Sequence, residues 1–140
     1  MRLKDKVAIV TGAGSGFGEG IARKFVAEGA KVLLVDLRGD AAEKAAAALG
    51  GENVARAWRA DVSSAGDTKS IFDAAERFFG PPDILVNNAG IGHKPQPLEG
   101  LDEHDFDRLF AINMKAIYLA MREAVPRFKA RAADARGLRG

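Results

Sequence analysis

The sequence predicts an α/β fold in which helices cover both faces of a doubly wound parallel sheet. Segments with strand-like and helix-like patterns alternate along the chain, which is typical of repeated strand–helix–strand units. The second apolar segment contains the continuous run 32–35, Val-Leu-Leu-Val, as expected for a strand that is buried on both faces. A glycine-rich turn directly follows the first apolar segment and precedes a helical pattern.

Each predicted element follows from a local pattern. Short apolar segments predict four strands, at residues 7–10, 31–36, 54–60 and 84–86. Helical spacing or composition predicts four helices, at residues 18–28, 40–49, 67–79 and 102–129. Residues 90–100 are rich in Gly and Pro, so we expect a mobile loop over a site. We expect residues 130–140 to be disordered.

Single residues predict where the helices begin, end or bend. Gly29 is the expected stop of the first helix. Asp40 and Glu43 have the spacing of a capping box, so they are expected to begin the second helix. Pro126 is expected to interrupt or kink the last helix, because proline removes a backbone donor.

The composition indicates one packed domain. The chain has 140 residues, of which 47% are hydrophobic and 29% charged, and it has no cysteine, so we expect a disulfide-free, cytoplasmic protein. It has no apolar signal segment and no run near the ~18 apolar residues of a membrane helix, so no membrane association is expected. The net charge of +2 is concentrated in residues 127–140, with five basic side chains and one acidic. No aromatic residue follows Phe128 to stack on a base, so nucleic-acid binding is not expected.

Residues 11–18, Thr-Gly-Ala-Gly-Ser-Gly-Phe-Gly, join the first strand to the first helix. A helix that begins near Ser15 presents unpaired backbone N–H groups and the positive end of its dipole to an anion. The spacing is Thr-Gly-x-x-x-Gly-x-Gly and not Gly-x-Gly-x-x-Gly, and the absence of Gly-Lys-Ser/Thr argues against an ATPase that handles a γ-phosphate. The motif predicts nucleotide binding, and the alternative is a tight turn without a ligand.

Four features of the chain resemble the short-chain dehydrogenase/reductase family. They are the glycine motif, Asp61-Val62 after the third strand, Asn87-Asn88-Ala89-Gly90 after the fourth, and Asn113 in the long helix. The similarity covers residues 3–129. It implies a Rossmann-like sheet with the strand order 3-2-1-4. It also implies an oxidoreductase that transfers a hydride between a nicotinamide coenzyme and a small alcohol or carbonyl substrate.

The predicted coenzyme is NAD, with NADP less favoured. Asp36 ends the second strand 18 residues after Gly18, where its carboxylate can accept hydrogen bonds from the adenosine ribose and repel a 2′-phosphate. Nearby Arg38 weakens this preference, and the alternative for Asp36 is a solvated carboxylate. The resemblance implies the following coenzyme contacts: Gly12, Ser15, Gly16, Phe17, Gly18, Asp36, Leu37, Asp61, Val62, Asn88, Ala89 and Gly90.

Two of the polar candidates have open alternatives. The resemblance implies that the Asp61 side chain meets the adenine amino group, beside the backbone of Val62. Asp61 could instead cap the third helix, for which Ser63 and Ser64 are equally good candidates. For Asn113 the resemblance implies that it holds a water molecule of a proton relay. A buried amide in a helix needs partners, so bonds to neighbouring backbone are the alternative, and the two roles are compatible.

The other catalytic residues of the family, a Ser and a Tyr-x-x-x-Lys, are not found. The single tyrosine, Tyr118, is followed four residues later by Arg122 and is expected to pack. Residues 71–140 contain no Ser or Thr. We therefore expect residues 1–129 to be an incomplete NAD-binding domain that is inactive alone, followed by a basic tail at 130–140.

Two other functions stay open, and self-association is expected. One is a non-catalytic nucleotide-binding or interaction module on the same fold, and the other is a methyltransferase that uses S-adenosylmethionine. The predicted strand order leaves the fourth strand at a sheet edge, and the long helix leaves part of Phe110, Ile117 and Met121 uncovered. Members of the family usually assemble through this helix, so a homo-oligomer is implied.

Overall fold

The computed structural model describes residues 1–133 and 137, and in these residues four parallel strands form a sheet with the order β3-β2-β1-β4. The strands are β1 (Val7–Thr11), β2 (Lys31–Asp36), β3 (Ala55–Arg59) and β4 (Ile84–Val86). The central strand β1 pairs with β2 on one side and with β4 on the other. This arrangement confirms the predicted doubly wound α/β fold and its strand order.

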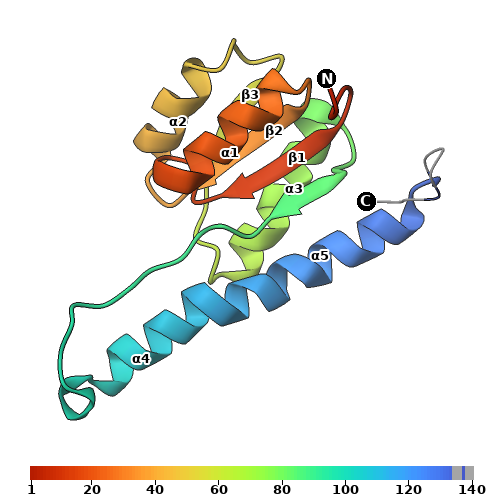
Figure 1. Ribbon diagram of the computed structural model, residues 1–140. Coiled ribbons are helices and arrows are strands. Elements are labelled where there is room, and N and C mark those ends of the chain that lie inside the picture. The colour runs from red at the N-terminus through yellow and green to blue at the C-terminus, as the bar shows by residue number, and fades with distance from the viewer. Residues whose placement is uncertain (134–136, 138–140) are drawn as a thin grey trace.

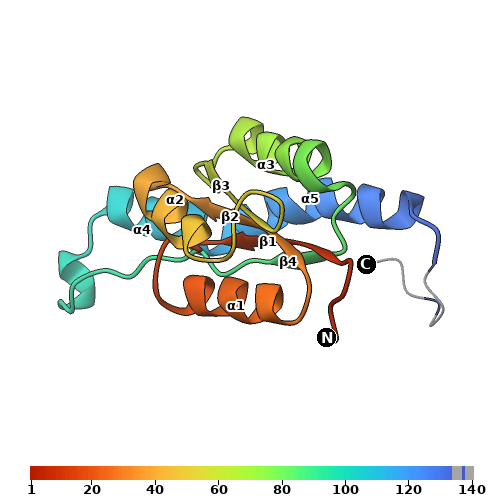
Figure 2. The ribbon, with the colours of Figure 1, turned by 90° about the horizontal axis from the view of Figure 1, so that it is seen from above.

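The helices lie on both faces of this sheet and extend beyond it (Figure 1). They are α1 (Gly16–Ala27), α2 (Gly39–Ala47), α3 (Ala65–Phe79), α4 (Glu103–Phe110) and α5 (Ala116–Ala130), with a 3-10 turn at Leu98–Gly100 and a π-helical turn at Ala111–Lys115. Figure 2 shows α1 and α3 on opposite sides of the sheet. Within the described residues, no helix combines the length and the apolar character needed to cross a membrane.

β2 is buried on both faces, which explains its continuous apolar run. Val32 and Leu34 belong to the core cluster shared with α1 and α2, whereas Leu33 and Val35 belong to the cluster shared with α3 and α5. All four side chains are fully buried. Burying one such side chain contributes about 1.5–3 kcal/mol. The prediction made from residues 32–35 is therefore confirmed.

The predicted capping box at Asp40 and Glu43 is wrong. α2 begins at Gly39, with Arg38 as its N-cap. The Arg38 N–H donates to Asp36 Oδ1 (2.9 Å) and the Arg38 C=O accepts from the Ala42 N–H (3.2 Å), so the chain turns into the helix directly after β2. Asp40 lies inside the first turn instead, where its negative charge interacts favourably with the helix dipole.

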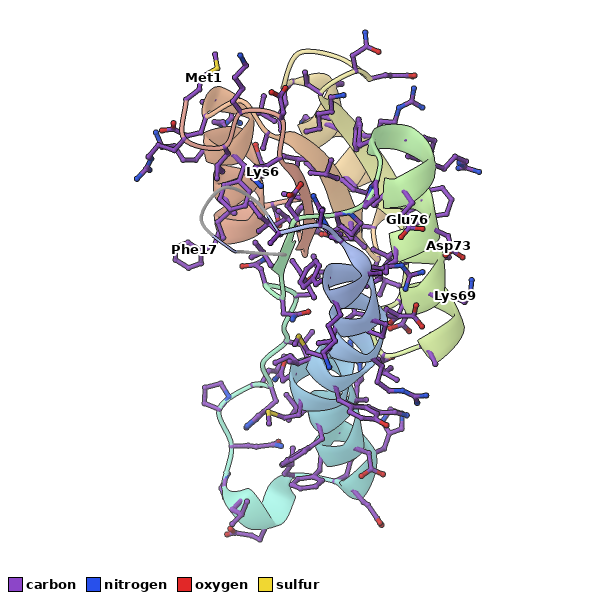
Figure 3. All side chains as sticks on the ribbon, turned by 90° about the vertical axis from the view of Figure 1, so that its right-hand side faces the viewer. Met1, Lys6, Phe17, Lys69, Asp73 and Glu76 are labelled. Carbon is purple, nitrogen blue, oxygen red and sulfur yellow. The ribbon has the colours of Figure 1, made fainter. Side chains whose placement is uncertain are left out.

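The predicted interruption at Pro126 is also wrong. α5 continues through Pro126 to Ala130, and the irregular turn lies earlier, at the π-helical residues 111–115. The Arg127 side chain, next to the proline, bonds Asp73 (3.1 Å) and Glu76 (2.9 Å) of α3. Figure 3 labels these two acidic residues on α3. Contacts with α3 therefore hold this part of α5 in place although proline removes one backbone bond.

Asp83 forms a buried ionic cluster at the start of β4. Its carboxylate accepts from the Val7 N–H (2.8 Å), Lys6 Nζ (3.0 Å) and Arg131 Nη2 (2.7 Å). Because a buried charge is tolerated only with partners, this cluster ties the beginnings of β1 and β4 to the end of α5. Of the segment 130–140 that is predicted to be disordered, residues 134–136 and 138–140 lie outside the described residues.

Candidate functional site

A cavity of about 490 Å³ opens at the carboxyl ends of the four strands. Ligands of open α/β sheets bind at this edge. The segments that follow β1, β2, β3 and β4 all contribute to its wall. The predicted contact residues that line the cavity are Gly12, Ser15, Phe17, Asp36, Leu37, Asp61, Val62, Asn88, Ala89 and Gly90. The other two, Gly16 and Gly18, belong to the same turn but do not line it.

The beginning of α1, next to this cavity, has free backbone donors. Ser15 is the N-cap, and the first bond of the helix joins the Glu19 N–H to the Ser15 C=O (3.4 Å). The N–H groups of Gly16, Phe17 and Gly18 therefore have no acceptor within the helix. The Phe17 side chain is 88% exposed and extends away from the protein (Figure 3). Three unpaired amides and a helix dipole make this turn suitable for an anion.

Two glycines let three backbone segments meet behind the cavity. A Cβ on Gly18 would lie 2.1 Å from the Gly12 carbonyl oxygen and 2.6 Å from Asn88 Nδ2. Gly12 has φ +63°, and a Cβ there would lie 2.9 Å from the Ala89 Cα. Close packing of α1 against the ends of β1 and β4 therefore explains why Gly18 is glycine, although it does not face the cavity.

Thr11 and Asn88 fasten the ends of β1 and β4 together. Asn88 Nδ2 donates to the carbonyl groups of Thr11 (2.9 Å) and Gly12 (3.2 Å). Thr11 Oγ1 accepts from the backbone N–H groups of Asn88 (3.1 Å) and Ala89 (3.0 Å) and donates to the Val86 C=O (3.3 Å). These bonds fix the floor of the cavity.

The Asp36 carboxylate lies at the end of β2, with 10% of its side chain exposed. Its Oδ2 accepts from the Gly14 N–H and its Oδ1 from the Arg38 N–H, both at 2.9 Å. Each carboxylate oxygen has a further lone pair, so both can still accept from hydroxyl groups of a ligand. Arg38 Nε lies 3.7 Å from Asp36 Oδ1, and Arg38 Nη2 donates to Ser15 Oγ (3.0 Å). A carboxylate and a guanidinium therefore stand side by side at this end of the cavity.

Ser64, and not Asp61, caps α3. Ser64 Oγ accepts from the Asp67 N–H (3.2 Å). Asp61 Oδ1 instead accepts from the N–H (2.9 Å) and the Oγ (2.6 Å) of Ser63. Asp61 and Val62 line the cavity on the side of β3. The capping alternative for Asp61 is therefore wrong, and the residue borders the cavity.

Asn113 lies in the π-helical turn and bonds the loop after β4. Its Oδ1 accepts from the Ile91 N–H (2.9 Å) and its Nδ2 donates to the Ile91 C=O (2.8 Å). These two bonds confirm the alternative that the Asn113 amide is bonded to neighbouring backbone groups. One N–H and one lone pair of the amide remain for a water molecule. Asn113 does not line the cavity, but its neighbours Ile112 and Ile91 do.

Tyr118 does not pack as predicted. Its side chain is 58% exposed, and the Arg122 guanidinium lies 5.7 Å from its ring centroid. The inward positions of α5 are held by small or aliphatic residues such as Leu119 and Ala120. Tyr118 directly precedes these buried positions and lies on the exposed side of the helix.

Sequence reasoning missed four residues of the cavity wall, Ala60, Ile91, Arg108 and Ile112, and it named Arg38 only as a neighbour of Asp36. Ile91 directly follows the predicted contact Gly90. Arg108 and Ile112 are four residues apart, a spacing that puts both on one helix face. Ile112 directly precedes Asn113, which was a predicted site residue. This neighbourhood is the signal that could have identified Ile112, and with it Arg108 on the same helix face.

The fold and the cavity together define a nucleotide-binding α/β protein of the Rossmann type. Residues 6–137 match the family described as short chain dehydrogenase, so the chain belongs to this family.

Known relatives match most of the chain. It is similar to zerumbone synthase of Zingiber zerumbet, with 38% identity over 134 residues, 92% of this chain and 50% of the relative. It is similar to the NADP-dependent (R)-specific alcohol dehydrogenase of Lentilactobacillus kefiri, with 40% identity over 128 residues, 91% of this chain and 50% of the relative. A solved 3-ketoacyl-(acyl-carrier-protein) reductase from Brucella melitensis, complexed with NADH, superimposes with a TM-score of 0.88 at 48% identity, covering 91% of this chain and 52% of that one. The chain thus spans about half the length of the relatives it matches.

Proposed function

We propose that the cavity binds NAD and that the chain is the coenzyme-binding part of an oxidoreductase for a small alcohol or carbonyl compound. One observation carries this proposal: Ser15 and Phe17, at the start of α1 with its free amides, line the same cavity of about 490 Å³ as Asp36. The amides of Gly16 to Gly18 hold the diphosphate, and Asp36 accepts from the adenosine ribose. Asp61 and Val62 border the adenine.

The far end of the cavity takes the reactive half of the coenzyme. Asn88, Ala89 and Gly90 lie along its second ribose, and Asn113 positions this loop through Ile91. Bound nicotinamide supplies hydride transfer. Residues 1–140 contain no Ser followed by Tyr-x-x-x-Lys, so we do not assign the acid/base step to them.

We propose a preference for NAD over NADP. The Asp36 carboxylate repels a 2′-phosphate, whereas the adjacent Arg38 guanidinium attracts it. Arg38 is already bonded to Ser15 and lies beside Asp36, so part of its charge is neutralised. The relatives show that either coenzyme form occurs on this fold, since one is named NADP-dependent and a solved one contains NADH.

Calorimetric titration of the chain with NAD, NADP and S-adenosylmethionine tests these proposals. We expect NAD to bind about tenfold more tightly than NADP, the size of one charge-assisted hydrogen bond. Asp36→Asn keeps the side-chain size and removes the charge, so it should lower the ratio of NAD to NADP affinity. Asp40→Asn, in the first turn of α2 and outside the cavity wall, is the matched control.

The outcomes separate the alternatives. A folded chain that binds none of the three compounds overturns the coenzyme proposal. Tighter binding of S-adenosylmethionine than of NAD would favour a methyltransferase. Equal affinity for NAD and NADP would overturn only the preference assigned to Asp36.

We also propose that the chain self-associates through α4 and α5. The apolar stripe consists of six side chains along these helices, each 42–58% exposed: Phe106, Phe110, Met114, Ile117, Tyr118 and Met121. The rings of Phe106 and Phe110 lie 4.7 Å apart between centroids. A contiguous apolar surface of this kind favours burial, and a second copy of the same helix offers a complementary one.

A further inference from the structure

β3 is one edge of the sheet, and its outer side carries unpaired backbone groups. The Val32 N–H donates to the Val54 C=O (2.8 Å), and the Ala60 N–H donates to the Asp36 C=O (3.2 Å). Since backbone groups alternate sides along a strand, the N–H and C=O of Ala57 and the N–H of Arg59 point away from β2. No strand of the described chain pairs with this side. The edge can therefore accept one further strand.

A hollow of about 550 Å³ follows this edge and reaches both faces of the sheet. Its floor is β3, one wall is α2 and the other is the end of α3. The residues that form it include Ala46 and Ala47 of α2, Ala55 and Ala57 of β3, and Phe78 of α3. Because the hollow lies on both sides of the strand, an added strand would have room for side chains on each face.

The two walls differ in chemistry. The α2 wall consists mainly of alanine side chains, which leave space for an apolar group. On the α3 wall the guanidinium groups of Arg56 and Arg77 each lie 4.5 Å from the Phe78 ring centroid. Trp58 packs edge-on against the same ring, at 6.1 Å between centroids. On the α3 side the hollow is thus lined by the aromatic rings of Trp58 and Phe78, and the Arg77 guanidinium stacks on these rings next to the lining.

Arg77 carries the charge that is available to a partner. Arg56 pairs with Glu52 (2.7 Å), whereas the described residues place no carboxylate within ion-pair distance of Arg77. Arg77 is exposed and stacks only on aromatic rings. On the opposite wall Glu43 disfavours a second anion. Charge complementarity therefore selects an acidic side chain toward α3 and an apolar one toward α2.

Charged residues on an edge strand commonly block pairing. Here both arginines of β3 are engaged elsewhere: Arg56 is held by Glu52 and Phe78, and Arg59 Nε donates to the Leu37 C=O (3.3 Å). Their guanidinium groups therefore do not stand in the way of an incoming backbone.

We propose that the β3 edge binds an extended peptide segment of another protein as an added strand, with acidic and apolar residues alternating along it. Main-chain hydrogen bonds to Ala57 and Arg59 hold the segment, and the two walls select its side chains. This interaction is separate from the coenzyme cavity, which lies at the carboxyl ends of the strands.

Amide hydrogen exchange of the full chain, followed by NMR, tests the proposal with a capped peptide of alternating valine and glutamate. Pairing predicts that exchange of the Ala57 and Arg59 amides slows about tenfold at saturation, while that of Gly16 and Gly18 does not change. A peptide of alternating valine and lysine should bind about fivefold more weakly, the upper range for one exposed ion pair. Unchanged exchange at Ala57, or equal binding of the two peptides, would overturn the proposal.

Two variants distinguish the contribution of backbone hydrogen bonds to peptide binding from the contribution of side-chain charge. Ala57→Pro removes the outward N–H while the bonds to β2 remain, so it should abolish peptide binding. Arg77→Gln should weaken binding of the glutamate peptide about threefold to fivefold, and it should not weaken binding of the lysine peptide. Arg122→Gln, which removes a ring-stacked guanidinium on α5, is the control. If Ala57 is protected without peptide and in proportion to protein concentration, a second copy occupies the edge and the peptide proposal fails.

Discussion

Gly18 and Gly20 lie two residues apart in α1, but only Gly20 has room for a side chain. A Cβ on Gly18 would lie 2.1 Å from the Gly12 carbonyl oxygen, whereas a Cβ on Gly20 would meet nothing within 4 Å. We predict that Gly18→Ala destabilises the protein by about 1–3 kcal/mol through overpacking and weakens NAD binding. Gly20→Ala should stabilise it by about 0.5–1 kcal/mol. Thermal unfolding of the two variants checks the contrast, and equal midpoints would contradict it.

The Asn113 amide gives a second test at a single position. In Asn113→Asp the oxygen can still accept from the Ile91 N–H, but the donor to the Ile91 C=O is lost and a carboxylate faces that carbonyl. We expect a loss of about 1–3 kcal/mol in stability and faster exchange of the Ile91 amide.

The control for Asn113 is Asn87→Asp, a change of the same size at an exposed residue after β4. Its effect should stay within about 0.5 kcal/mol. An Asn113→Asp protein that unfolds like the Asn87→Asp protein would show that the loop does not depend on the amide.

Individual site residues were predictable where they belong to one local segment. The glycine turn, Asp36 and the run Asn88 to Gly90 all follow a strand directly, so their place at the carboxyl edge depends only on the parallel sheet. Arg108 and Ile112 reach the cavity only because α4 and the π-helical turn lie beside the loop that contains Ile91. The helix sequence marks this face only by its position beside Asn113, and it does not show that the face meets the loop.

At the level of elements, the strands and the order of helices were predicted, whereas several helix ends were not. α2 begins at Gly39 because the Arg38 N–H is taken by Asp36, a contact with the preceding strand. The π-helical turn at 111–115 coincides with the bonds from Asn113 to Ile91. Boundaries of this kind depend on partners outside the helix, so propensity and capping patterns do not determine them.

The end of α1 is predicted to respond to pH. A hydrogen bond from Lys24 and one from the Arg2 backbone N–H lower the pKa of Glu28 from 4.5 to about 2. Because the folded-state pKa is below the unfolded value, ionised Glu28 stabilises the fold above about pH 4.5, and this contribution is lost as the pH falls toward 2.

Urea unfolding of the wild type and of Glu28→Gln across this pH range measures the effect. The difference in stability should be full at pH 7 and should shrink steadily below about pH 4.5. Glu43→Gln on α2, an exposed carboxylate without an ion pair among the described residues, is the control. A difference between wild type and Glu28→Gln that does not change with pH would refute the assignment.

For the whole molecule, the apolar stripe predicts concentration-dependent assembly. Sedimentation equilibrium should show dimers or larger species of the wild type. Phe110→Glu and Met114→Glu replace side chains that are 54% and 58% exposed, so they should weaken assembly about tenfold with little effect on folding. Leu98 is 83% exposed and lies outside the stripe, so Leu98→Glu should change neither assembly nor folding. A wild type that stays monomeric at high concentration would contradict the prediction.

The π-helical turn also sets the angular phase of α4 relative to α5. A wider turn accommodates one residue more than an α-helical turn, and each residue of an α-helix advances the chain by about 100° around the axis. Deleting a single codon, that of Met114, would let residues 103–130 run as one regular helix. Because α3 holds the later part and the wider turn already absorbs the extra residue, the earlier part would keep nearly the same orientation and Arg108 would still face the cavity. The π-helical turn therefore keeps the Arg108 face of α4 toward the cavity although it contains one residue more than an α-helical turn.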